Sequence, residues 1–195
     1  MDNYNKIKEM ARKNNGIITS QMLSDKNIQT IYLTRMVRQG ELERIDRGIY
    51  STEKVMIDEY YLLYRKNQRA IFSFSSALYL HNLTDRIPYQ MEITLPNTYN
   101  SGHISEDIII HKVVQKYYSL GCTIRKTMFG NEVACYDMER TICDLVRFRS
   151  KIDVDIFKKA LVGYKNHSNR DYQKLRQYAK VFRISRQIND ILDVI

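Results

Sequence analysis

The chain has 195 residues, of which 44% are hydrophobic and 27% charged, so it is long enough for one medium domain or two small ones. This balance excludes wholesale disorder. The two prolines and seven glycines are too few for collagen-like repeats or a Pro- or Gly-rich linker. The formal net charge is +9, because the chain has 31 Lys and Arg residues and 22 Asp and Glu residues. Such an excess indicates a polyanionic partner.

No stretch approaches the roughly 18 to 20 apolar residues of a membrane-spanning helix, and the first residues lack the layout of a secretory signal. We therefore expect a cytoplasmic protein without a membrane partner. The cysteines form no Cys-x-x-Cys motif, and the four histidines show no zinc-ligand spacing. We expect reduced thiols, no metal site and no cofactor. The three cysteines are Cys122, Cys135 and Cys143.

The positive charge is concentrated in the two ends of the sequence. Residues 1–52 carry a net charge of +3, residues 53–140 are neutral, and residues 141–195 carry +6. This distribution predicts more than one electrostatic surface.

The first fifty residues have the pattern of a winged helix-turn-helix. Gly16 and Gly40 are placed to end helices in the left-handed conformation, and residues 46–48 (Asp-Arg-Gly) have the chemistry of a hairpin turn. Apolar spacing and capping residues predict, in chain order, a helix over residues 3–14, a strand at 17–18, a helix capped by Thr19 or Ser20, a helix over 29–39, and strands at 42–45 and 48–51.

The helix predicted over residues 29–39 has one apolar face and one polar face. At 100° per residue, Leu33, Met36 and Val37 fall together, so the opposite residues are free to enter a DNA groove. Arginine can donate two hydrogen bonds to guanine, and basic residues on a wing suit phosphate or minor-groove contacts. We predict DNA contact for Lys26, Thr30, Ile31, Thr34, Arg35, Arg38, Arg44 and Arg47. The alternative is a small helical bundle with a hairpin that mediates protein contacts.

The rest of the chain predicts a mixed sheet followed by a helical bundle, so the fold class is α+β. The predicted elements are a helix over residues 55–66 with Tyr60, Leu63 and Tyr64 on one face, a helix capped by Ser75 or Ser76, strands at 89–95, 108–114, 123–128 and 132–136, a helix capped by Asp137, and helices over 155–164, 169–183 and 185–192. These boundaries give a winged helix-turn-helix domain over residues 1–53, a connecting helix over 54–71 and a C-terminal domain over 72–195.

The C-terminal part also offers candidate catalytic residues. Asp144 is a candidate carboxylate and Cys143 a candidate nucleophile, but both fall inside a predicted helix, where such residues usually serve packing and local hydrogen bonds. Residues 92–94 (Glu-Ile-Thr) have a glutamate but threonine where a Glu-x-Lys nuclease element has lysine. We therefore predict that the chain is not an enzyme. The alternative is a winged-helix protein with an enzymatic C-terminal domain, either a degenerate nuclease or an enzyme that modifies nucleic acid or a toxin.

A second polyanion surface is predicted in the basic C-terminal stretch. Its candidate partners are DNA or an RNA, and the alternative is a solvated helical bundle without a partner. The candidate residues are Arg147, Arg149, Lys151, Lys158 and Lys159, with Arg170, Lys174 and Arg176 further along the chain.

Five segments of the sequence resemble AbiEi-family antitoxins, in the order that the family has. Residues 33–42 (LTRMVRQGEL) and 47–50 (RGIY) resemble its N-terminal domain. Residues 73–83, 92–96 and 137–146 (DMERTICDLV) resemble the helix, the strand and the late helix of its C-terminal domain.

The resemblance implies a bacterial type IV toxin–antitoxin component linked to abortive infection by phage. Such proteins repress their own operon by binding inverted repeats in the promoter through the winged helix. Their C-terminal domain counteracts a cognate nucleotidyltransferase toxin, and no stable complex of the two is expected.

Overall fold

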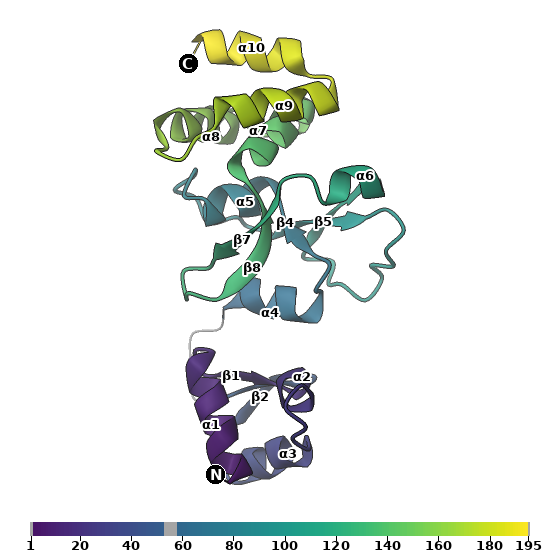
Figure 1. Cartoon of the computed structure of the whole chain (residues 1–195), viewed down its shortest axis with the longest axis vertical. Coiled ribbons are helices and arrows are strands. Elements are labelled where there is room, and N and C mark those ends of the chain that lie inside the picture. Colours follow the sequence, from purple (N-terminus) through teal and green to yellow (C-terminus); the bar gives the residue numbers. More distant parts are fainter. Residues whose placement is uncertain (1, 53–57, 195) are drawn as a thin grey trace. The chain divides into compact units, whose positions relative to one another are not determined.

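The structure is a computed structural model that describes residues 2–52 and 58–194, and the chain divides into two compact units. Unit 1 comprises Met1–Asp58 and unit 2 comprises Glu59–Ile195 (Figure 1). Each unit has its own hydrophobic core.

Unit 1 has the element order predicted for a winged helix-turn-helix. Its strands form an antiparallel sheet in the order β1-β3-β2, and β2 and β3 are joined by the predicted hairpin turn. The elements are α1 (Asn3–Lys13), β1 (Ile17–Thr19), α2 (Ser20–Ser24), α3 (Ile31–Arg38), β2 (Glu43–Asp46) and β3 (Ile49–Ser51).

Local sequence signals define the element boundaries of unit 1. The Thr19 hydroxyl accepts a hydrogen bond from the Met22 amide at 3.2 Å and thereby caps α2. Gly40 and Gly48 have φ of +73° and +74°, so glycine is favoured after α3 and in the hairpin turn. The core beneath these elements consists of Ile7, Ala11, Ile18, Leu23, Ile28, Leu33, Met36 and Leu42.

Unit 2 is a five-stranded mixed sheet with helices, which confirms the α+β prediction. The strand order is β6-β5-β4-β8-β7; β5 pairs in parallel with β6 and β4 with β8, and the other pairs are antiparallel. The elements are α4 (Glu59–Lys66), β4 (Ile71–Phe72), α5 (Phe74–Leu80), β5 (Glu92–Pro96), β6 (Ile109–Val113), α6 (Gln115–Tyr118), β7 (Cys122–Lys126), β8 (Glu132–Tyr136), α7 (Met138–Arg147), a 3-10 turn (Arg149–Lys151), α8 (Val154–Asn166), α9 (Tyr172–Phe182) and α10 (Ser185–Val194).

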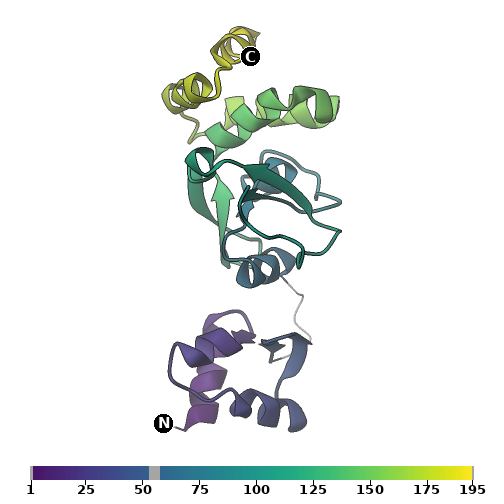
Figure 2. The ribbon, with the colours of Figure 1, turned by 90° about the vertical axis from the view of Figure 1, so that its right-hand side faces the viewer.

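The helices of unit 2 form two groups around the sheet. Helix α4 lies on one side, against β8, and helices α7 to α10 lie on the other in both views (Figure 1, Figure 2). Helix α7 is central to the bundle, since it packs against α5, α8, α9 and α10. Its residues Ile142 and Leu145 are almost fully buried in the main core of unit 2.

Most of the segment expected to connect the two parts, from Glu59 onward, belongs to unit 2. Residues 53–57, which include the predicted domain boundary and the predicted start of the helix, lie outside the described residues. Helix α4 begins at Glu59 and buries Leu63 of the predicted face together with Tyr61. The other two residues of that face, Tyr60 and Tyr64, are half-buried: the Tyr60 ring lies 4.8 Å from that of Phe72, and Tyr64 packs against a buried cluster of the sheet. A unit that began at residue 72 would lose α4 and half of β4, the central strand.

The start of α5 also differs from the prediction. Ser73 occupies the N-cap position, and Phe74 has φ of +47°, which is unusual for a bulky side chain. Neither predicted cap residue caps the helix. The Ser75 hydroxyl donates to Glu92 Oε1 at 2.5 Å, and the Ser76 hydroxyl accepts from the Glu92 amide at 2.8 Å. These two serines therefore attach α5 to β5.

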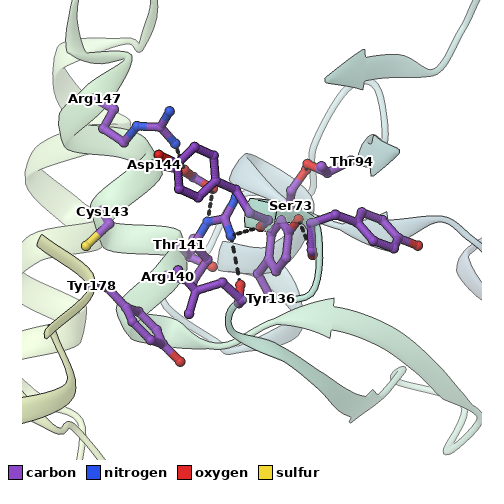
Figure 3. A network of polar contacts seen from close by, with 12 residues as sticks. Ser73, Thr94, Tyr136, Arg140, Thr141, Cys143, Asp144, Arg147 and Tyr178 are labelled. Atoms are coloured by element: carbon purple, nitrogen blue, oxygen red, sulfur yellow. Dashed lines mark hydrogen bonds and ion pairs between the residues drawn. The ribbon is translucent and has the colours of Figure 1, made fainter. Parts of the chain in front are cut away.

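Arg140 of α7 is fully buried where the sheet meets the helical bundle. Its Nε donates to Asp144 Oδ2 at 2.8 Å, and its Nη1 donates to the Tyr117 and Leu120 carbonyls, each at 2.7 Å. The guanidinium also lies over the ring of Tyr136, 4.1 Å from its centroid. Figure 3 shows Asp144 between Arg140 and Arg147, and Arg147 Nη1 donates to the other Asp144 oxygen at 2.8 Å.

Gly121 allows the chain to pass close to Arg140. A Cβ atom at this position would lie 2.6 Å from Arg140 Cβ, and the backbone has φ of +78°. We predict that Gly121→Ala destabilises unit 2 by about 3 kcal/mol, the sum of overpacking and an unfavourable backbone conformation. Urea unfolding measures this difference. Gly130→Ala is the control, because Gly130 has φ of +83° but a Cβ there would meet nothing within 4 Å. Equal losses in the two variants would contradict the packing argument.

His81 links the end of α5 to the end of β8. Its Nε2 lies 2.7 Å from the Tyr136 carbonyl, and burial lowers the pKa of His81 to about 4 from 6.5. The unfolded chain therefore takes up this proton at a higher pH than the folded chain does. The stabilisation is complete above pH 6.5 and is lost as the pH falls toward 4.

We predict that acidification over this range costs unit 2 up to about 3 kcal/mol through His81. In His81→Gln the amide can still donate to the Tyr136 carbonyl but does not titrate, so the pH dependence of unfolding becomes shallower. Urea unfolding at several pH values measures it. His103→Gln is the control, because His103 is exposed and the glutamine amide can still donate to Asn67 Oδ1, which lies 3.0 Å from His103 Nε2. An unchanged pH profile in His81→Gln would show that this proton is not linked to folding.

Candidate nucleic-acid interface

The core of unit 1 determines which face of α3 meets solvent. Leu33 and Met36 are fully buried, whereas the side of the helix that carries Thr34, Arg35 and Arg38 is exposed. Ile31, at the first residue of α3, is 46% exposed and lies outside the buried core. The predicted DNA-contact residues of this helix are thus all accessible.

An aromatic pair on α1 and α3 supports Arg35. The rings of Tyr4 and Tyr32 meet edge to face at 5.4 Å, and the Arg35 guanidinium lies 5.9 Å from the centroid of the Tyr32 ring. Within the described part of the chain, neither Arg35 nor Arg38 forms an ion pair. Both guanidinium groups are therefore free to donate to an acceptor outside the protein.

The turn before α3 adds Lys26 and Thr30, which are both exposed. Lys26 lines a cleft of about 280 Å³ together with Lys6 and Lys13 of α1. Glu9 lines the same cleft and pairs with Lys13 at 3.8 Å, so Lys6 and Lys26 are the two lysines there that suit contact with a phosphate backbone.

The wing contributes Arg44 and Arg47, whose side chains are both exposed. Arg44 Nε donates to the Asp46 carbonyl at 3.3 Å, and the Arg47 amide donates to the Asp46 carboxylate at 2.6 Å. The Asp46 carbonyl thus holds the Arg44 side chain, and the Asp46 carboxylate holds the Arg47 amide. The Arg47 side chain remains available for phosphate or minor-groove contacts.

The five residues predicted as a second polyanion surface do not form one free surface. Arg147 is paired with Asp144 and lies over the Phe182 ring. Arg149 donates to the Ile152 carbonyl at 3.1 Å, and Lys159 donates to Asp85 at 2.9 Å. The two residues that remain exposed without such a contact are Lys151 and Lys158.

The candidate catalytic pair of α7 is buried and committed to internal contacts. Burial raises the pKa of the Cys143 thiol to about 12, and this thiol lies 3.9 Å from the Leu175 carbonyl. Burial also raises the pKa of Asp144, while Arg140 and Arg147 oppose the shift by pairing with the carboxylate. Such an arrangement suits a structural role better than nucleophilic catalysis.

The structure brings together a polar cluster that the sequence did not predict. Glu92 accepts from Ser75 through Oε1, and Glu92 Oε2 lies 2.7 Å from His111 Nε2. Thr94, from the incomplete nuclease motif, is buried and donates to the Ser73 hydroxyl at 2.9 Å. Sequence spacing does not predict that these residues meet, because the cluster forms where β5, β6 and the start of α5 come together.

Over residues 2–52 and 58–194, no three His, Cys, Asp or Glu side chains come together as ligands for a metal ion. Nor does any helix within them have the length and apolar character to cross a bilayer.

Unit 1 thus combines a short pair of helices, α2 and α3, with exposed basic residues on α3 and in the β2–β3 hairpin. In agreement, residues 5–52 match the family model described as "Transcriptional regulator, AbiEi antitoxin". The match runs from α1 through β3, so it covers the elements of unit 1 and confirms the resemblance over this segment. None of the curated proteins matches the chain.

A solved structure is similar to the chain over almost its whole length. It is described as the crystal structure of the RV2827C protein from Mycobacterium tuberculosis, with a TM-score of 0.51 and 11% sequence identity. The alignment covers 96% of this chain and 79% of that one. At this identity the similarity concerns the fold alone, and it includes unit 2, which the family model does not reach.

Proposed function

We propose that the protein is an antitoxin that represses transcription of its own operon by binding promoter DNA through unit 1. The observation that carries the proposal is the exposed row of Thr34, Arg35 and Arg38 on α3 within a domain of the AbiEi regulator family. In this proposal α3 enters the major groove, where the arginines donate to guanine. Arg44 and Arg47 contact the backbone or the minor groove beside it, and Lys26 contacts phosphate.

For unit 2 we propose the antitoxin activity itself. The resemblance of residues 73–83, 92–96 and 137–146 to the C-terminal domain of the family supports this role. By the same resemblance, the system is of type IV, the operator contains inverted repeats, and the toxin is a nucleotidyltransferase that forms no stable complex with its antitoxin. The proposed biological outcome is abortive infection, a defence against phage.

An enzymatic unit 2 is the less favoured alternative. It would need a reactive nucleophile or carboxylate, but Cys143 is buried with a raised pKa and Asp144 is held between two arginines. Metal-dependent cleavage of nucleic acid, or covalent modification of a toxin, by the purified protein would support it.

We predict that Arg35→Ala combined with Arg38→Ala weakens binding to the promoter by about 2 kcal/mol or more, roughly thirty-fold in Kd, because two groove contacts are lost. Fluorescence anisotropy with a labelled promoter duplex at fixed salt measures the change. Lys158→Ala combined with Lys165→Ala is the control, since it removes two exposed positive charges from α8. Equal affinities of the two double variants would refute the assignment of α3 to the groove.

We predict that protection against the toxin does not require DNA binding. The Arg35→Ala/Arg38→Ala chain, and a fragment that begins at Glu59, should both restore colony formation when the toxin is expressed, because unit 2 has its own core. Promoter activity should rise in the same cells, since repression is lost. A fragment that folds, as judged by circular dichroism, yet gives no protection would show that the two roles are not separable.

A further inference from the structure

The two arginines on the exposed face of α3 have different surroundings. In a helix, a long side chain leans toward the N-terminus and lies over the residues three and four positions before it. For Arg35 the residue three positions earlier is Tyr32, and the Arg35 guanidinium lies 5.9 Å from the centroid of the Tyr32 ring. For Arg38 these positions hold Arg35 and Thr34, and no aromatic ring of the described residues contacts its guanidinium. Of the two arginines, Arg35 therefore has the neighbour that restricts its orientation.

Tyr32 is itself held in place by α1. The rings of Tyr4 and Tyr32 meet at 88°, the edge-to-face arrangement that aromatic rings favour. Both side chains are half-buried and pack against the core of unit 1. Tyr4 lies one turn before Ile7 of α1, and Ile7 is fully buried in that core, so the backbone that carries Tyr4 is fixed. The Tyr32 ring is therefore a restrained support for the Arg35 guanidinium.

An arginine that reads a base has to present its guanidinium in one plane. Donation of two hydrogen bonds to guanine requires both N–H groups to lie along the edge of the base. A free arginine side chain has many rotamers, and their loss on binding costs free energy. A ring that restricts the side chain before DNA is bound lowers this cost, because fewer rotamers remain to be lost.

We propose that Arg35 determines more of the base specificity of unit 1 than Arg38 does, and that Tyr32, held by Tyr4, is its positioning residue. Tyr32 acts without touching the DNA, since it orients the guanidinium that donates to guanine. Arg38 contributes to affinity, but its guanidinium is oriented only when DNA is bound. The inference rests on the proposed DNA binding by α3. It adds which side chain discriminates between bases and which ring prepares that side chain.

The main test is a double-mutant cycle on Tyr32 and Arg35 in the full chain. The Kd for a labelled duplex of the chain's own promoter is measured at fixed salt for the unmodified chain, Tyr32→Leu, Arg35→Ala and their combination. Leucine is apolar and favours a helix but has no ring. We expect Tyr32→Leu to raise Kd about fivefold when Arg35 is present and less than about twofold when it is absent, because the ring then has no guanidinium to orient. Equal effects in the two backgrounds would overturn the proposal, since Tyr32 would then only stabilise the fold.

Two further variants separate the ring of Tyr32 from its hydroxyl and from its support. Tyr32→Phe keeps the ring and should bind the promoter within about twofold of the unmodified chain. Tyr4→Leu removes the edge-to-face contact and should raise Kd, but by less than Tyr32→Leu does. Circular dichroism establishes that each variant is folded, and Tyr4→Leu replaces Tyr32→Leu in the cycle if the latter does not fold. A loss of affinity in Tyr32→Phe as large as that in Tyr32→Leu would show that the hydroxyl acts and that the positioning role of the ring is wrong.

Base discrimination tests the difference between the two arginines. Each G·C pair of the promoter site is changed to A·T in turn, and the ratio of the Kd values for the changed and the original duplex is measured. We expect Arg35→Ala and Tyr32→Leu to lower this ratio at the same base pair, by about tenfold and about threefold. A loss of discrimination in Arg38→Ala as large as that in Arg35→Ala would overturn the proposal. Unchanged promoter affinity in both arginine variants would instead refute the proposed groove binding by α3, an outcome distinct from equal effects in the cycle.

Discussion

The buried guanidinium of Arg140 is the interaction on which the architecture of unit 2 depends. It bonds Asp144 within α7 and the carbonyls of Tyr117 and Leu120 before β7, while lying over the ring of Tyr136 in β8. A charge removed from water is tolerated only when it is paired and hydrogen-bonded, so these partners must all be in place together. Gly121 has to be glycine for the chain to fit beside it. The sheet and the helical bundle are therefore joined in one geometry.

Because several cations of unit 2 are used in internal contacts, the net charge of +9 overstates the positive charge that a partner can meet. In unit 2, Arg140, Arg147 and Arg149 serve the interior or its border, and Lys159 and Lys174 are paired with acids. Other cations of unit 2, among them Lys151, Lys158 and Lys165, are exposed and form no ion pair among the described residues. In unit 1 the opposite holds, because the predicted DNA-contact residues are all exposed. Unit 1 has the smaller net charge, but its predicted contact residues are all accessible to a partner.

The two units also differ in how their functions can be inferred. Unit 1 matches a family of transcriptional regulators, and its exposed α3 and wing suggest how such a regulator binds DNA. The fold of unit 2 resembles a solved structure at 11% identity, so the role proposed for it rests on the resemblance of three sequence segments to the antitoxin family. The buried Cys143 and the paired Asp144 suit packing and internal pairing better than catalysis.

The sequence alone determined the elements of unit 1, the α+β class and the exposed face of α3, because these depend on local signals: helical spacing, the Thr19 cap, and glycines at positive φ. Only the tertiary structure decided that β4 is the central strand, that α4 belongs to unit 2, and which C-terminal cations are free. A two-residue strand carries no periodicity, and an ion pair such as Lys174–Asp137 joins residues far apart in the chain. Whether a charged side chain is used internally depends on such distant partners, which sequence spacing does not specify.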